Sequence, residues 1–355
     1  MEQDIDALYY NAVDLLKEMI STPSFSREEH NVAEVIISCM RKMGFSPDRK
    51  GNNLWIRNKD FDSLKPTILL NSHMDTVRPV SGWTKDPFFP EEDGDTLYGL
   101  GSNDAGASLV CLLHVFFMLN QKKQDYNLIF LASCEEEVSG NGGAEAVVPE
   151  LPQIAFGIVG EPTQMNPAIA EKGLLVLDCT SYGKAGHAAR NEGENAIYKA
   201  IKDIEWFRTY EFPQTSDLLG PVKMTVSMVS AGTQHNVVPD KCHFVVDVRS
   251  NELYSNEELY HIIDKHTDCE VKPRSFRLNS SRISLENPFV QRAIIIGKTP
   301  YGSPTLSDQT FMPFPTLKMG PGDSARSHTA NEYIHLSEIR EAIELYVKLL
   351  DRLRI

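Results

Sequence analysis

Side chains able to bind a metal ion follow apolar stretches at several separate points of this 355-residue sequence. They are His73, Asp75, Asp104, Glu135, Glu136, Glu137, Glu161 and His328. Neutral imidazoles and carboxylates are donors that borderline-soft divalent ions such as Zn²⁺ accept. A two-metal site also needs a carboxylate shared between ions that lie ~3.5–4 Å apart. Since no cysteine belongs to the set, a closed thiolate site is not expected.

Most of these side chains come soon after short apolar runs with the composition of buried strands, at residues 67–71, 127–133 and 156–159. Taken singly, each has an ordinary explanation, because a strand-end histidine or a run of glutamates is usually solvated. Together they favour one shared crevice, since open α/β sheets bind their ligands just beyond the carboxyl ends of their strands.

Asp75 lies two residues after His73, and therefore on the same side of an extended segment. We expect the Asp75 carboxylate to accept the second ring N–H of His73 and so to fix the orientation of the imidazole. The pair is interpreted as a metal ligand and the group that orients it.

The wider pattern of the chain predicts an α/β fold. Apolar helical patterns alternate with short strands, which favours a mostly parallel central sheet with helices on both faces. Between residues 174 and 281 the order becomes β-α-β-β-α-β, that of a ferredoxin-like α+β unit. We therefore expect a small domain, 174–281, inserted into a larger one formed by residues 1–173 and 282–355.

Composition restricts the partners and the location of the protein. The chain has 35 basic and 49 acidic residues and a formal net charge of −14, which argues against nucleic-acid and anionic-membrane partners. The start is acidic, unlike a secretory signal, and the longest near-apolar stretch, 107–119, is too short to span a bilayer. Six scattered cysteines without a C-x-x-C motif indicate reduced thiols and a cytoplasmic location.

The segments SHMDTV, GLGSNDAG, SCEEEVSG, VGEPT and SHTANEY, in this order, resemble the motif series of the dinuclear zinc deacylase and exopeptidase family. That family includes acetylornithine deacetylase, succinyl-diaminopimelate desuccinylase, aminoacylase and glutamate carboxypeptidase. The resemblance covers essentially the whole chain and implies two Zn²⁺ ions, with Co²⁺ or Mn²⁺ able to substitute. It implies His73 and Glu161 as ligands of one ion, Glu137 and His328 as ligands of the other, and Asp104 as the bridge.

The family's acid-Glu-Glu triplet falls on the three consecutive glutamates. With Val138 aligned to the residue after the triplet, the resemblance makes Glu136 the general base and Glu137 a ligand. A shift of one residue would make Glu135 the base and Glu136 the ligand. We prefer the first register because residues 133–134 then fill the two positions before the acid.

Three residues of the expected insertion resemble family groups that contact the substrate. His187 resembles a lid histidine that reaches the active site of a neighbouring subunit, which implies a homodimer through this domain. Asn236 and Arg249 resemble groups that hold the α-carboxylate of the substrate, where a bidentate Arg is suited. Without the resemblance they would be a loop histidine, a turn residue and a strand-end charge.

The resemblance implies hydrolysis of the amide bond of a small N-acyl amino acid by a metal-bound hydroxide, with Glu136 as general base. Acetylornithine deacetylase-type enzymes are the nearest in pattern, so N-acetyl-L-ornithine or N-succinyl-L-ornithine, converted to L-ornithine in arginine biosynthesis, is the expected substrate. Succinyl-diaminopimelate desuccinylase, a dipeptidase and an inactive metal- or amino-acid-binding relative remain alternatives. A succinyl donor would need a cation, and the candidates are Lys172, Lys184, Arg190 and Arg326.

Overall fold

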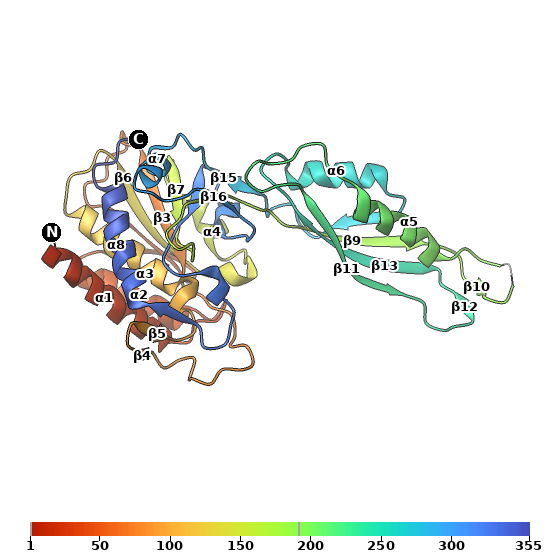
Figure 1. Ribbon diagram of the computed structural model, residues 1–355, viewed down its shortest axis with the longest axis horizontal. Coiled ribbons are helices and arrows are strands. Elements are labelled where there is room, and N and C mark those ends of the chain that lie inside the picture. Colours follow the sequence, from red (N-terminus) through yellow and green to blue (C-terminus); the bar gives the residue numbers. More distant parts are fainter. Residues whose placement is uncertain (1, 191) are drawn as a thin grey trace. The chain divides into compact units, whose positions relative to one another are not determined.

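The computed structural model describes residues 2–190 and 192–355, and the chain forms two compact units (Figure 1). Unit 1 consists of Met1–Ile169, Arg282–Tyr301 and Ser307–Ile355, and unit 2 of Ala170–Ser281 and Gly302–Leu306. Unit 2 thus begins at residue 170, whereas the sequence predicted residue 174, and it includes a short return segment that was not expected.

The main sheet of the described chain has nine strands in the order β1-β2-β6-β3-β7-β17-β8-β15, with β16 paired to β8. The strands are β1 (Asp48–Lys50), β2 (Asn53–Arg57), β3 (Thr67–His73), β6 (Asn127–Ser133), β7 (Phe156–Val159), β8 (Ala168–Glu171), β15 (Ser281–Arg282), β16 (Tyr301–Ser303) and β17 (Thr316–Lys318). The central strands β6, β3, β7 and β17 are parallel, whereas β2 and β8 are antiparallel to their neighbours. The prediction of a mostly parallel central sheet is confirmed.

Helices cover both faces of this sheet (Figure 1). On one face α3 packs against β3 and β6, with α1 and α8 behind it. On the other face Leu69 and Ile129 pack with Val147 of α4. The helices of unit 1 are α1 (Glu2–Ile20), α2 (His30–Lys42), α3 (Ala107–Asn120), α4 (Ala144–Val147), α7 (Pro288–Ile295) and α8 (Leu336–Leu350).

Helix α3 is buried over nearly its whole length, from Ala107 to Leu119. A helix that is apolar on all sides belongs in an interior, and α3 lies between the sheet and two further helices. The stretch Ser102–Asn120 is long and apolar enough to cross a membrane, a longer one than the sequence analysis identified. It is 94% buried inside the protein, as is usual for a core helix.

A small sheet that the sequence analysis did not predict lies beside the main one. Its order is β18-β5-β4, formed by β4 (Glu91–Asp93), β5 (Thr96–Tyr98) and β18 (Tyr333–His335). Strands of three residues are too short to show an alternating pattern, so the sequence does not predict them. The pairing of β18 with β5 brings the segment after His328 beside the segment before Asp104.

Unit 2 is a four-stranded antiparallel sheet of order β11-β13-β9-β14 with two helices. The elements are β9 (Leu175–Tyr182), α5 (Ala196–Thr209), β11 (Lys223–Ala231), β13 (Lys241–Arg249), α6 (Asn256–His266) and β14 (Glu270–Pro273). Phe207, Phe244 and Ile263 belong to one apolar cluster shared by the helices and the sheet. The ferredoxin-like β-α-β-β-α-β order is therefore confirmed. A two-stranded ribbon, β10 (Gly186–His187) with β12 (Val237–Val238), is additional.

Candidate active site

The structure brings all five predicted metal ligands together in unit 1. Donor atoms of His73, Asp104 and Glu137 all lie within 4.8 Å of one another. Asp104 faces a histidine with each oxygen, because Oδ1 lies 3.3 Å from Nε2 of His73 and Oδ2 lies 3.7 Å from Nε2 of His328. Glu161 Oε1 lies 3.8 Å from His73 Nε2, and Glu137 Oε2 lies 2.8 Å from His328 Nε2. One carboxylate thus stands between two ligand pairs, the arrangement that a shared ligand requires.

The parallel sheet explains why these residues meet. His73 is the last residue of β3, and Ser133 at the end of the parallel strand β6 is its pairing partner. The triplet follows β6, and Glu161 comes two residues after the end of β7. Because parallel strands end at the same edge of a sheet, the segments after β3, β6 and β7 deliver their side chains to one place.

The electrostatics of the cluster fit divalent cations. Burial raises the pKa of Glu161 to about 8. The negative charges of Asp104 and Glu137 also raise this pKa, whereas His73 and Lys318 lower it. Oε1 of Glu161 is buried and has no hydrogen-bond partner among the described residues. The hydrogen bond to Glu137 raises the pKa of His328 to about 9. Crowded carboxylates therefore hold protons on the imidazoles, and metal ions would replace those protons with stronger positive charge.

The prediction for the Asp75 carboxylate is wrong in its geometry. Nδ1 of His73 lies 2.9 Å from the backbone carbonyl of Asp75 but 3.6 Å from its carboxylate Oδ1. A 3.6 Å separation is too long for a hydrogen bond, so the carbonyl orients the ring. The carboxylate instead accepts the backbone N–H groups of Glu136 and Glu137 and the hydroxyl of Ser26.

The three glutamates of the triplet point to different surroundings. Glu137 lies with the ligands, whereas Oε2 of Glu135 lies 3.6 Å from Arg27 Nε. Burial raises the pKa of Glu136 well above its ordinary value, and neighbouring carboxylates, including Glu161, add to it. The geometry agrees with the register in which Glu136 is the base and Glu137 the ligand, and disfavours the alternative that uses Glu135 as the base.

Glu332 is a site residue that the sequence analysis missed, although it lies in the SHTANEY segment. Its carboxylate accepts the backbone N–H groups of Gly101, Asn103 and Asp104 at 3.0, 2.9 and 2.9 Å. The side chain is buried, which raises its pKa to about 8 together with the charge of Asp104. Glu332 therefore holds the turn that presents the shared carboxylate.

Asp308 is a second missed residue. It is buried, it accepts a hydrogen bond from the hydroxyl of Ser133, and its charge contributes to the raised pKa of Glu136. It lies in a short 3₁₀ turn, Asp308–Phe311, where no apolar run or spacing in the sequence marked a functional position.

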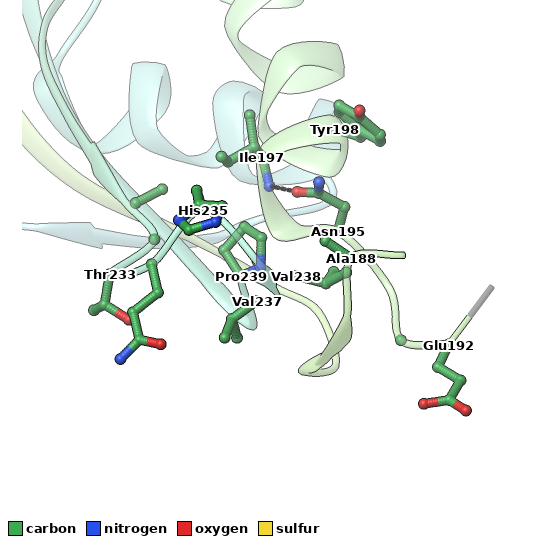
Figure 2. Close-up of a pocket in the computed structure, with 14 residues that line it drawn as sticks. Ala188, Glu192, Asn195, Ile197, Tyr198, Thr233, His235, Val237, Val238 and Pro239 are labelled. Atoms are coloured by element: carbon green, nitrogen blue, oxygen red, sulfur yellow. Dashed lines mark hydrogen bonds between the residues drawn. The ribbon is translucent and has the colours of Figure 1, made fainter. Parts of the chain in front are cut away.

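His187 and Asn236 lie close together at one end of unit 2. The β10–β12 ribbon pairs His187 with Val237, and the N–H of Ala188 donates to the carbonyl of Asn236 at 3.0 Å. Both side chains are exposed. A hollow of about 820 Å³ adjoins this ribbon, and Figure 2 shows its lining, which includes Tyr198.

Within unit 2, Arg249 lies far from His187 and Asn236. It ends the nine-residue strand β13, which begins at Lys241 just beyond the ribbon. At ~3.3 Å per residue, the strand separates its ends by roughly 26 Å. The guanidinium also binds Asp247 bidentately, at 2.8 and 3.0 Å. Within one unit 2, Asn236 and Arg249 therefore lie too far apart to hold the same carboxylate, and their contacts with the substrate stay a prediction.

The family assignment follows from sequence comparison. Residues 69–352 match the family model described as peptidase family M20/M25/M40. The chain belongs to this family. It is therefore a metal-dependent amidohydrolase, in agreement with the clustered ligands and with the resemblance found in the motifs.

Members of the M20 family with curated functions cover most of the chain at modest identity. Acetylornithine deacetylase of Proteus mirabilis is 26% identical, covering 96% of this chain and 96% of its own length. Succinyl-diaminopimelate desuccinylase of Dechloromonas aromatica is 29% identical over 73% of this chain and 74% of its own. The YXEP protein of Bacillus subtilis, described as a dinuclear metal binding peptidase of the M20 family, shares the fold with a TM-score of 0.73 at 15% identity, covering 98% and 100% of the two chains.

Proposed function

We propose that this M20 hydrolase deacylates an N-acyl amino acid, N-acetyl-L-ornithine or N-succinyl-L-ornithine, to L-ornithine, a step of arginine biosynthesis. The observation that carries the hydrolytic assignment is the position of Asp104, with one oxygen toward each histidine. The similarity to the Proteus acetylornithine deacetylase over nearly the full length of both chains supports the choice of substrate. An intact set of base and ligands argues against an inactive relative.

The proposed mechanism depends on where the chain holds its own groups. When bound, divalent ions supply the Lewis acid that polarises an amide carbonyl and lowers the pKa of water. Glu136 takes the proton of the attacking water and returns it to the departing amine nitrogen. Asp75, which accepts the N–H of Glu136 at 3.0 Å, keeps that carboxylate in place.

We propose Zn²⁺ as the resident metal, with Co²⁺ or Mn²⁺ as substitutes. Two imidazoles and three carboxylates within one cluster are nitrogen and oxygen donors of the kind that zinc accepts. Titration of the metal-free chain with Zn²⁺ should reach two equivalents. Saturation at one equivalent would remove the bridging role of Asp104.

Succinyl-diaminopimelate is the second candidate substrate, because the Dechloromonas desuccinylase has the higher identity over a shorter match. Of the cations considered for a succinyl carboxylate, Arg326 is already paired with Glu338 in unit 1. Lys172, Lys184 and Arg190 belong to unit 2, where they remain candidates.

We also propose a homodimer formed through unit 2, in which His187 serves the neighbouring copy. Strand β11 is an edge strand, and Met228 and Val229 on it are 64% and 59% exposed. Helix α5, which packs beside β11, exposes Tyr198 and Ile201 by 73% and 55%. Exposed apolar side chains along an unpaired edge favour association. Light scattering should give twice the chain mass, and Met228→Glu should give monomers; a monomeric wild type would contradict the dimer.

A cytoplasmic location remains our proposal for the compartment. All six cysteines are free thiols in the part of the chain that the structure describes, and five of them are buried. Persistent free thiols favour a reducing compartment. Labelling the thiols of the purified protein after it has been unfolded checks this, since six reactive groups are expected.

The experiment that tests the substrate is a comparison of kcat/KM for N-acetyl-ornithine, N-succinyl-ornithine and N-succinyl-diaminopimelate on the Zn²⁺-loaded enzyme. We expect one of the two ornithine derivatives to be hydrolysed fastest, by at least about tenfold. A higher value for the diaminopimelate derivative would favour the second candidate. Two bound equivalents of zinc without turnover of any N-acyl amino acid would favour the inactive relative.

A further inference from the structure

The backbone of the base-bearing triplet is bound by two carboxylates from elsewhere in unit 1. The N–H groups of Glu136 and Glu137 donate to Asp75 at 3.0 and 3.2 Å. The N–H of Glu135 donates to Oε1 of Glu29 at 3.1 Å, across 106 positions of the sequence. Three consecutive backbone donors at the end of β6 are thus held by side chains.

The side chain of Glu29 accepts the N–H of Glu135 instead of capping helix α2. It occupies the position before helix α2, where a side chain commonly accepts an N–H of the first helical turn. Among the described residues its side chain makes no such cap. Instead Oε1 also accepts the N–H of Arg27 at 2.6 Å, and Oε2 accepts the amide of Asn52 at 2.9 Å. The side chain is fully buried, and these N–H donors offset the cost of burying its charge.

Glu135 needs such support because its backbone conformation is unusual. Its φ of 58° lies in the left-handed region, which side chains other than glycine rarely adopt. This turn aims the next two N–H groups at Asp75. Its own carboxylate fills the space over Gly140 and Gly142, where an added Cβ would lie 2.0 and 2.3 Å from the carboxylate oxygens. The left-handed turn is therefore fixed on both sides, by the 140–142 loop and by Glu29.

We propose that Glu29 is a positioning residue for the general base. By binding the N–H of Glu135 it stabilises the left-handed turn that directs Glu136 toward the reacting atoms. Ser26, three residues earlier, donates its hydroxyl to Asp75 Oδ2 at 2.7 Å. The segment before α2 thus supports both carboxylates that bind the triplet. The proposal rests on the role of Glu136 in the proposed function.

The kinetic test uses Glu29→Ala, Glu29→Gln and the control Glu28→Ala, each loaded with Zn²⁺ and assayed with N-acetyl-L-ornithine. Glu29→Ala is expected to lower kcat by ~30–100-fold with KM within about twofold, because small displacements of a catalytic group cost this much. Glu29→Gln retains a carbonyl oxygen for the N–H of Glu135, so it should lose less than about tenfold. Glu28 is an exposed carboxylate paired with Arg78, and its loss should leave kcat unchanged.

Zn²⁺ titration and amide hydrogen exchange complete the test, since neither depends on turnover. All variants should bind the same number of zinc equivalents as the wild type. In Glu29→Ala residues 135–137 should exchange about tenfold faster, and in Glu29→Gln faster by a smaller factor, whereas the later turns of α2 should keep the wild-type rate in both. Should Glu29→Ala not fold, Glu29→Gln carries both measurements.

Two results would overturn the proposal. One is wild-type kcat together with wild-type exchange at 135–137 in a folded Glu29 variant. The other is equal acceleration throughout α2, which would make Glu29 a general stabiliser of the helix. If the wild type hydrolyses no N-acyl-ornithine, the proposed substrate fails, and the exchange of residues 135–137 still decides whether Glu29 holds the turn.

Discussion

The ligand cluster of unit 1 and the ribbon end of unit 2 hold their functional candidates in opposite ways. In unit 1 the candidates follow buried strands, and carboxylates such as Asp75 and Glu332 bind the backbone around them. In unit 2, His187 and Asn236 are exposed on a ribbon of two-residue strands.

This difference indicates that the two groups of residues need different degrees of preorganisation. Groups that must hold metal ions within tenths of an ångström need a preorganised scaffold, because small displacements cost much of the rate. Groups that meet a substrate or a second subunit gain their contacts only on association. Substitutions in the ligand cluster of unit 1 should therefore alter metal binding or the chemical step, and substitutions at the ribbon should alter the rate with folding and metal content intact.

The largest effect is expected inside the triplet. Glu136→Gln should retain both metals yet lose ~10³–10⁴-fold in kcat, because it removes the proton acceptor. Glu137→Gln should also weaken Zn²⁺ binding, since Glu137 lies among the ligand atoms. Steady-state kinetics with metal analysis of both variants checks this. Exchanged phenotypes would show that the triplet is read in the wrong register.

The next effect tests the ribbon. His187→Ala should lower kcat by ~10²–10³-fold if the imidazole assists the developing oxyanion. Melting temperature and zinc content should match the wild type, because the side chain is exposed. An unchanged kcat would show that His187 takes no part in the chemical step. A lowered melting temperature would show that the ribbon side chain also supports the fold, contrary to the contrast between the ligand cluster and the ribbon.

A pH experiment compares a buried histidine of unit 1, His114, with the exposed His187 of unit 2. His114 on α3 is buried, and burial lowers its pKa to about 4. The unfolded chain binds this proton near pH 6.5, so stability should fall by about 3 kcal/mol as pH decreases from about 6.5 to 4. Urea unfolding of His114→Leu should lack this part of the slope, whereas His187→Ala should keep it. An identical slope in the wild type and His114→Leu would contradict the assignment.

The smallest effect concerns the turn around Asp104. Glu332→Gln leaves at least one backbone N–H of the turn without its carboxylate acceptor, so Zn²⁺ affinity should fall by ~10–100-fold. The control Glu341→Gln removes an exposed carboxylate of α8 and should bind zinc as the wild type does. Competition titrations with a chelator measure both. Equal affinities would mean that the turn holds Asp104 without Glu332.

The ligands were predictable because an apolar run that ends in a charged side chain is a local pattern. His73 at the end of β3 and Glu161 after β7 are of this kind, and the parallel sheet makes them neighbours. Glu29, Glu332 and Asp308 leave no such pattern, since a carboxylate that binds backbone N–H groups needs no fixed spacing or partner type. Their contacts cross 106, 228 and 175 positions of the chain.

A closer reading could have anticipated the pairing of Arg249. Asp247 lies two residues before it, so both side chains stand on the same side of β13. The strands of the small sheet could not be predicted in this way. Three residues of β5 and three of β18 carry no periodic signal, yet their pairing places Glu332 beside the turn of Asp104.

By itself the sequence determined the α/β class, the inserted ferredoxin-like unit, the five candidate ligands and the family, because burial periodicity and motif order are local properties. Only the tertiary structure decided which oxygen of Asp104 faces which histidine, and that the carbonyl of Asp75 orients His73. It also decided that Glu137 lies among the candidate ligands, whereas Glu135 lies toward Arg27. These choices depend on differences of about an ångström between atoms brought together by long-range strand pairing, and no spacing along the chain encodes them.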